Sequence, residues 1–212
     1  MNDLVTHGLS VLMGFFAIMN PIATTPVFIG VTGQDDEQMR KTIAAKSLIL
    51  AFVIVVSFCL AGQFVFTLFG ITLPAFRITG GFLVFLIGFQ MLQGEGSPVQ
   101  TLKGDAEKVS RDAALSVAVS PLAMPILAGP GTITTAMGFV ADEGPMVFAI
   151  TIIAFGLLCV VTYICFISGE RLVRFMGEEA MRVITRMMGL ITAIIGTQMV
   201  IDGIRGAITL GS

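Results

Sequence analysis

The chain has 212 residues, of which 55% are hydrophobic and only 12% are charged, with a net charge of −2. A soluble domain carries about 25% charged residues, and a chain this apolar would expose too much apolar surface to water, so the composition excludes an ordinary soluble protein. The sequence also lacks the basic patch that nucleic acid binding requires, and we expect no nucleic acid partner.

Six apolar segments long enough to cross a bilayer follow one another along the chain. A hydrocarbon core of about 30 Å requires roughly 20 residues of helix. The two shorter segments, the third and the sixth, continue past Arg77 and Arg186, whose long side chains can reach the membrane surface. We predict helices at about 4–31, 43–69, 74–93, 113–140, 145–169 and 183–208, joined by polar linkers at 33–41, 94–112 and 169–181.

The number of Lys and Arg residues alternates between high and low in and beside the successive segments that connect these spans. Ten lie after the first, third and fifth spans: Arg40, Lys41, Lys46, Lys103, Lys108, Arg111, Arg171, Arg174, Arg182 and Arg186. The other side has only Arg77 and Arg205. Because cytoplasmic loops carry the excess of Lys and Arg, we expect these ten residues on the cytoplasmic side and both termini on the outer, periplasmic side of the membrane.

The third and sixth spans contain the same types of residue in the same order. Arg77 and Gly80 precede the sequence from Gly88 to Met91, and Arg186 and Gly189 precede the sequence from Gly196 to Met199, with one residue of difference in spacing. Chance similarity between apolar helices is the alternative. Because each repeat would contain an odd number of spans, three, the second copy must cross the membrane in the opposite direction to the first. This arrangement is common in transporters.

The predicted fold is therefore an all-α membrane protein with six transmembrane helices arranged as two inverted three-helix repeats. We expect a single membrane domain over 1–212, with a first repeat at 1–93, a cytoplasmic linker at 94–112 and a second repeat at 113–212.

Prolines and glycines interrupt the first and fourth spans near their middle. Proline removes a backbone N–H and clashes with the preceding turn, so several together should unwind the helix. Unwound backbone at membrane depth must face protein or a water-filled cavity, and the half-helix ends then offer partial charges suited to a zwitterion. The alternative is that the prolines only bend packed helices. The candidate site residues are Asn20, Pro21, Thr24, Thr25, Ser120, Pro121, Pro125, Gly129, Gly131 and Thr132.

Three further polar groups lie within the spans. Gln90 and Gln198 are expected mainly to hydrogen-bond between helices, with substrate contact as the alternative. Asp202 is expected to form an ion pair with Arg205 one turn later, with proton coupling as the alternative.

Three separated stretches resemble the signatures of the MarC family of bacterial inner-membrane proteins. They are the sequence from Met19 to Phe28, the sequence from Pro121 to Gly131, and the sequence from Arg186 to Arg205. The resemblance covers essentially the whole chain and implies a six-span protein of the lysine-exporter-like superfamily. Ala23 stands where family members often have glycine, and its methyl group could narrow a cavity there.

The resemblance further implies a transporter of small neutral amino acids such as glycine and alanine. It implies that the unwound parts of the first and fourth spans form the substrate site. The residues that correspond are Asn20, Pro21, Thr24, Thr25, Pro121, Pro125, Gly129, Gly131 and Thr132.

We accordingly expect a secondary transporter, an exporter or exchanger that works by alternating access without a cofactor or a metal. The sequence has no G-x-x-x-x-G-K-[ST] motif for nucleotide binding. A membrane enzyme is disfavoured because the single histidine, His7, is peripheral and no carboxylate pair lies within the spans. The remaining alternatives are an exporter of other small or drug-like compounds and an accessory membrane subunit without transport activity.

Overall fold

The structure is a computed structural model that describes residues 2–33, 35–93, 127–140 and 144–211. All its elements are helices: α1 (Asn2–Met19), α2 (Pro21–Thr32), α3 (Glu37–Phe69), α4 (Leu73–Gln93), α6 (Pro130–Val140), α7 (Pro145–Ile167) and α8 (Gly169–Gly211). Five stretches are long and apolar enough to cross a membrane: Thr6–Gly30, Glu37–Gly62, Leu73–Gln93, Pro145–Ile167 and Glu179–Thr209. The chain is a multi-pass helical membrane protein, which confirms the predicted fold class.

The fourth predicted span is described only in its last part, which forms α6. The linker predicted at 94–112 and the residues from 113 to 126 lie outside the described residues.

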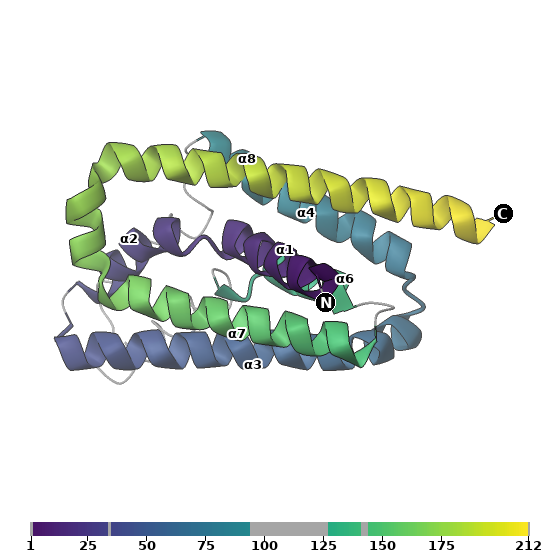
Figure 1. The fold of residues 1–212 in the computed structure, drawn as a ribbon, viewed down its shortest axis with the longest axis horizontal. Helices are drawn as coiled ribbons and strands as arrows, with labels where there is room; N and C mark the ends of the chain where they lie inside the picture. Colours follow the sequence, from purple (N-terminus) through teal and green to yellow (C-terminus); the bar gives the residue numbers. More distant parts are fainter. Residues whose placement is uncertain (1, 34, 94–126, 141–143, 212) are drawn as a thin grey trace.

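The helices form three layers (Figure 1). α3 packs against α7 on one side and α4 packs against α8 on the other, while α1, α2 and α6 lie between these pairs and contact both. The core is aromatic: the rings of Phe15 and Phe155 are 5.0 Å apart, and those of Phe28 and Phe166 stack at 4.4 Å. Large apolar side chains on the outer faces, such as Phe64, are exposed, as expected for helices that face lipid.

α8 begins earlier than the predicted sixth span, because most of the polar linker predicted at 169–181 is itself helical; it lies largely between the candidate spans Pro145–Ile167 and Glu179–Thr209. The stretch 170–176 contains good helix formers. Gly177 then has φ 72° and ψ 161°, a backbone conformation that glycine adopts readily. Figure 1 shows the part of α8 before Gly177 crossing the end of the bundle and the part after it running along α4. Gly177 thus forms the corner between the two parts.

Glycines bring the backbones of α4 and α8 into close contact. A methyl group at Gly81 would lie 2.6 Å from the carbonyl oxygen of Gly196, and one at Gly88 would lie 2.6 Å from that of Gly189. Positions increase along α4 as they decrease along α8, so the helices are antiparallel. Small residues allow such close approach in membranes, where van der Waals packing drives helix association.

The contacts between α4 and α8 are reciprocal. Gly81 approaches Met199 of α8, and Gly189 approaches Met91 of α4; a methyl group would lie 2.8 Å and 2.7 Å from the respective Cβ atoms. Likewise Gly88 faces the backbone nitrogen of Ala193, and Gly196 faces that of Phe85. Each contact is repeated when every position is shifted by 108 residues. Within this pair of helices the contacts follow a two-fold relation.

The reciprocal contacts correct the alignment of the two spans. The position equivalent to Gly189 is Gly81 and not Gly80, which removes the difference of one residue in spacing. Gly80 instead faces Thr134 of α6, where a methyl group would overlap the threonine side chain.

We expect Gly196→Ala to lower the free energy of unfolding by about 1–3 kcal/mol, because the added methyl group would overlap the backbone of Phe85, which cannot move independently of α4. Thermal unfolding in detergent measures the effect. Gly30→Ala is the matched control, since Gly30 is also helical but has nothing within 4 Å of an added methyl group. Equal melting temperatures for the two variants would contradict the close packing of α4 and α8.

Candidate functional site at the helix break

The first predicted span is broken at a single residue. Asn20 separates α1 from α2 and has φ 39° and ψ 73°, a left-handed conformation that asparagine tolerates better than most residues. Its Oδ1 accepts a hydrogen bond of 3.1 Å from the backbone N–H of Ala23, and so caps α2. Pro21 occupies the first helical position, where no N–H is needed. Asn20 and Pro21 together end one helix and begin the next.

The unwound segment is shorter than predicted. Pro26 lies inside α2 without interrupting it. The hydroxyl of Thr24 lies 3.0 Å from the carbonyl oxygen of Asn20, and that of Thr25 donates to the carbonyl oxygen of Pro21 at 2.7 Å. These two predicted site residues therefore satisfy the backbone of their own helix.

The break removes the helical partner of a carbonyl near the end of α1, that of Ala17. In a continuous helix the N–H at position 21 would bond to the carbonyl of Ala17, but proline has none. The hydroxyl of Thr192 in α8 lies 3.0 Å from this oxygen and 2.8 Å from the carbonyl oxygen of Met188 on its own helix. Thr192 is fully buried. The single proton of this hydroxyl can be donated to either oxygen, so α8 places a donor within reach of the carbonyl that the break leaves free.

Two buried polar atoms close to this region have no hydrogen-bond partner among the described residues. They are Nδ2 of Asn20, whose residue is 2% exposed, and the hydroxyl of Thr135 in α6. A buried donor without an acceptor costs about 1–3 kcal/mol. An acceptor on a ligand would remove that cost at Asn20.

α6 provides a second helix start, with buried residues on both sides of its first residue, Pro130. Gly129 is not helical, its carbonyl accepts from the N–H of Ile133 at 3.0 Å, and Pro130 occupies the first position of α6. Gly131 and Thr132 lie in the first turn and are buried, and a methyl group at Gly131 would lie 3.7 Å from Ile18, in the last turn of α1. Both predicted residues thus lie near the break at Asn20. Ser120, Pro121 and Pro125 lie outside the described residues.

A cavity of about 480 Å³ lies between α1, α4, α6 and α8. It is lined by Ser10, Met13, Gly14, Phe16, Ala17, Arg77, Thr135, Gly138, Phe139, Met188, Ile191, Ile195, Gln198, Met199 and Asp202. Of the predicted residues, Gln198 and Asp202 line it, whereas the described residues at the helix breaks do not. Ala17, whose carbonyl faces Thr192, connects the cavity wall to the break.

The cavity also includes residues that were not predicted to belong to the site. Arg77 was interpreted only as a cation near a helix end, although a charge within an apolar span is itself a signal of function. Ser10 and Thr135 gave no comparable signal, because hydroxyl side chains are common in membrane helices.

The predicted partners of the polar groups are partly wrong. Gln198 donates from Nε2 to Oδ1 of Asp202 at 3.0 Å, so it bonds within α8 and not between helices. Asp202 does not form the expected ion pair with Arg205 in the structure described. Gln90 is half-buried on α4 and bonds to no described residue.

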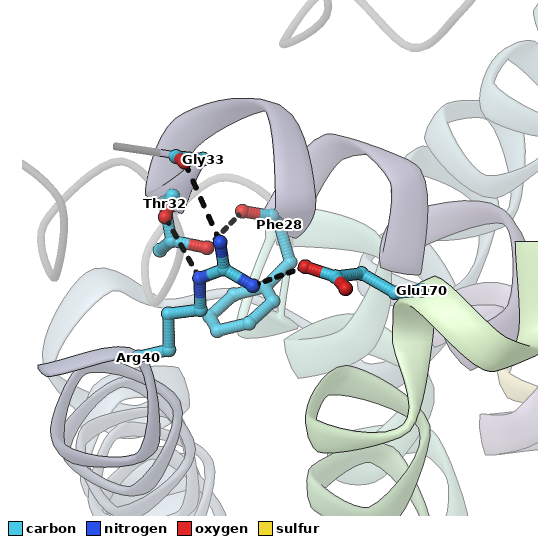
Figure 2. Close-up of polar contacts among 5 residues, drawn as sticks. All are labelled: Phe28, Thr32, Gly33, Arg40 and Glu170. Carbon is cyan, nitrogen blue, oxygen red and sulfur yellow. Dashed lines mark hydrogen bonds and ion pairs between the residues drawn. The ribbon is translucent and has the colours of Figure 1, made fainter. Parts of the chain in front are cut away.

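The opposite end of the bundle is closed around Arg40, near the start of α3 (Figure 2). Its guanidinium donates to the carbonyl oxygens of Thr32 (3.1 Å) and Gly33 (3.4 Å) at the end of α2, and to Oε1 of Glu170 at the start of α8 (2.5 Å). A cation at a helix C-terminus satisfies carbonyls that have no helical partner. Arg40 thus joins three helices on the side opposite the start of α4.

We expect Thr192→Val, which keeps the shape of the side chain, to cost about 1–3 kcal/mol of stability because the carbonyl of Ala17 loses its donor. Thr197→Val is the matched control, since its exposed hydroxyl bonds only to the carbonyl of Ala193 on its own helix. Thermal unfolding of both variants in detergent compares them. A Thr192→Val protein as stable as the control would show that the break does not depend on α8.

Residues 5–208 match the family described as MarC family integral membrane protein. The chain is 42% identical to a UPF0056 membrane protein of Pyrococcus horikoshii over 92% of each chain. It is 36% identical to the UPF0056 membrane protein YvbG of Bacillus subtilis over 92% of this chain and 93% of the other, and 31% identical to the UPF0056 inner membrane protein MarC of Salmonella typhimurium over 93% and 92%. No solved structure matches the chain. These matches over nearly the full length show that the chain belongs to the MarC family of integral membrane proteins.

Proposed function

We propose that the chain is a secondary transporter of small neutral amino acids, such as glycine and alanine, that works by alternating access. The observation that carries the proposal is the buried break at Asn20, where the side-chain Nδ2 has no acceptor among the described residues. Broken helices at the centre of a transporter typically form the substrate site, with helix N-termini directed at the carboxylate of the substrate. α2 begins at the buried Pro21, and α6 begins at Pro130 between the buried Gly129 and Gly131, which fits this arrangement.

The distribution of open and closed regions supports the same proposal. A cavity reachable from the surface at Ser10 and Gln198 lies on one side of the break, and the contacts of Arg40 close the other end. A transporter that alternates access must be able to hold one side closed while the other is open. We propose that the central site is lined by Asn20, Gly129, Gly131 and Thr132, together with Pro21, Ser120, Pro121 and Pro125. We also propose that the two halves of the chain are inverted repeats.

A second candidate is the export of apolar compounds. The wall of the cavity contains Phe16 and Phe139 with several Met and Ile side chains, which suits an apolar ligand. The two candidates predict different competitors of the uptake of labelled glycine. Alanine should compete if the first is correct, and apolar amines without a carboxylate should compete if the second is correct.

We expect proteoliposomes that contain the protein to accumulate radiolabelled glycine and alanine in a saturable manner. Asn20→Ala and Thr132→Ala should each reduce the initial rate at least tenfold. Asn20→Asp is informative because it keeps an oxygen that can cap α2 and replaces the Nδ2 donor with a carboxylate oxygen that repels the carboxylate of the substrate, so it should reduce uptake as well. Thr42→Ala is the control, because Thr42 is exposed on α3 and bonds to the carbonyl of Gln38. Normal uptake by all the Asn20 and Thr132 variants would overturn the proposed site.

We also propose that the protein resides in the bacterial inner membrane with both termini in the periplasm, because the basic residues Arg40, Lys41, Lys46, Arg171 and Arg174 belong to the opposite end of the bundle. In intact spheroplasts, a cysteine added at either terminus should react with a thiol reagent that cannot cross the membrane. A terminus that reacts only after permeabilisation would lie in the cytoplasm, and this result would overturn the proposed orientation.

A further inference from the structure

We infer that the cavity between α1, α4, α6 and α8 is a binding site for zwitterions, in which Arg77 binds a carboxylate and Asp202, held by Gln198, binds an ammonium group. The identification of the ligand as a small amino acid rests on the proposed function. The assignment of the two charged groups rests on the cavity itself.

The size and wall of the cavity suit a small ligand. Its volume of about 480 Å³ lies within the range of roughly 300–1,000 Å³ that is usual for small-molecule sites. Most of the wall is apolar, and the polar side chains are those of Ser10, Arg77, Thr135, Gln198 and Asp202. A few placed polar groups in an apolar wall are the usual means of orienting a ligand.

The two charges of the cavity are not neutralised by each other. Among the described residues, ion pairs join Arg40 to Glu170 and Lys41 to Glu37, and neither includes Arg77 or Asp202. Both side chains are half-buried, so each is partly removed from water without an ionic partner in contact. The hydrogen bond from Gln198 fixes Oδ1 of Asp202 and leaves its other oxygen available.

A cavity with one cation and one anion selects ligands that carry both charges. The guanidinium of Arg77 offers paired N–H donors that match a carboxylate, while the carboxylate of Asp202 accepts from an ammonium group. A ligand with a single charge leaves one partly buried group unpaired, which is costly. The apolar wall would receive a small side chain.

The position of the cavity connects this site to the helix break. Phe16 and Ala17 line the cavity, and Ala17 precedes Asn20 by three residues. The charged groups lie on α4 and α8, whereas the break lies between α1 and α2. We place the zwitterion site before the central site along the same path from the surface.

The experiment is equilibrium binding of radiolabelled glycine to the purified protein in lipid nanodiscs, together with uptake by proteoliposomes. In an Asn20→Ala background, which removes binding at the proposed central site, Arg77→Gln and Asp202→Asn should each weaken glycine binding at least tenfold. Arg205→Gln is the matched control, since Arg205 is exposed on α8 three residues after Asp202 and does not line the cavity; it should change binding less than twofold. Arg77→Lys keeps the charge without the paired donors and should give an intermediate loss, and the melting temperature of each variant establishes that it is folded.

Competition tests the role of each charge. For the unmodified protein, glycinamide and acetate should each compete at least tenfold less well than glycine, because each lacks one of the two charged groups. In Arg77→Gln the advantage of glycine over glycinamide should disappear.

The outcomes separate this inference from the proposed function. Transport by the unmodified protein, with unchanged glycine binding in folded Arg77→Gln and Asp202→Asn, would overturn the zwitterion site and leave the transporter standing. Glycine binding that depends on Arg77, without transport under any gradient, would support the site and count against the transporter. An unmodified, folded protein that binds no glycine would overturn the site.

Discussion

A membrane interior supplies no water to satisfy a free backbone group, and the structure depends on how the chain meets this constraint at Pro21. The missing N–H frees the carbonyl of Ala17, and a hydroxyl from α8, 175 residues away in the sequence, lies in hydrogen-bonding distance of it. The conformation of Asn20 and the cap at Ala23 then start a new helix within one residue. Lipid cannot satisfy the carbonyl that such a break leaves free, and here a neighbouring helix carries a donor at the same depth. The position of α8 and the break in the first span therefore determine each other.

The close packing of α4 and α8 fixes where that donor lies. Thr192 is adjacent to Ala193, whose backbone faces Gly88, so the contact between the glycines sets the height of the hydroxyl relative to α1. The same helix carries Gln198 and Asp202 into the cavity, and α4 carries Arg77. One glycine-lined contact thus positions both the support of the break and the charged side chains beside it. Side chains larger than hydrogen at these glycines would separate α4 from α8 and move all of these groups together.

Composition and local chemistry were sufficient to predict the helical membrane fold, because apolar segments and basic linkers record directly what lipid and the membrane surface require. Pro21 likewise predicted the break. The extent of the break was not predictable, since whether Pro26 unwinds a helix depends on neighbours that are distant in the sequence. The helical form of the linker at 169–181 was not predicted, although its residues favour a helix that turns at Gly177. Arg77 was overlooked because only the fold shows that it shares a cavity with Asp202.

The reciprocity of the contacts between α4 and α8 has a consequence for ancestry. The contact of Gly81 with Gly196 has its counterpart in the contact of Gly189 with Gly88, so the interface does not require two different sequences. A chain of half the length, inserted into the bilayer in both orientations, could form the same interface with a second copy of itself. Fusion of two such copies would fix one orientation for each half and free the halves to diverge. Thr192 and Val84, which occupy equivalent positions 108 residues apart, illustrate that divergence: one carries the hydroxyl that supports the break, and the other is a buried apolar side chain.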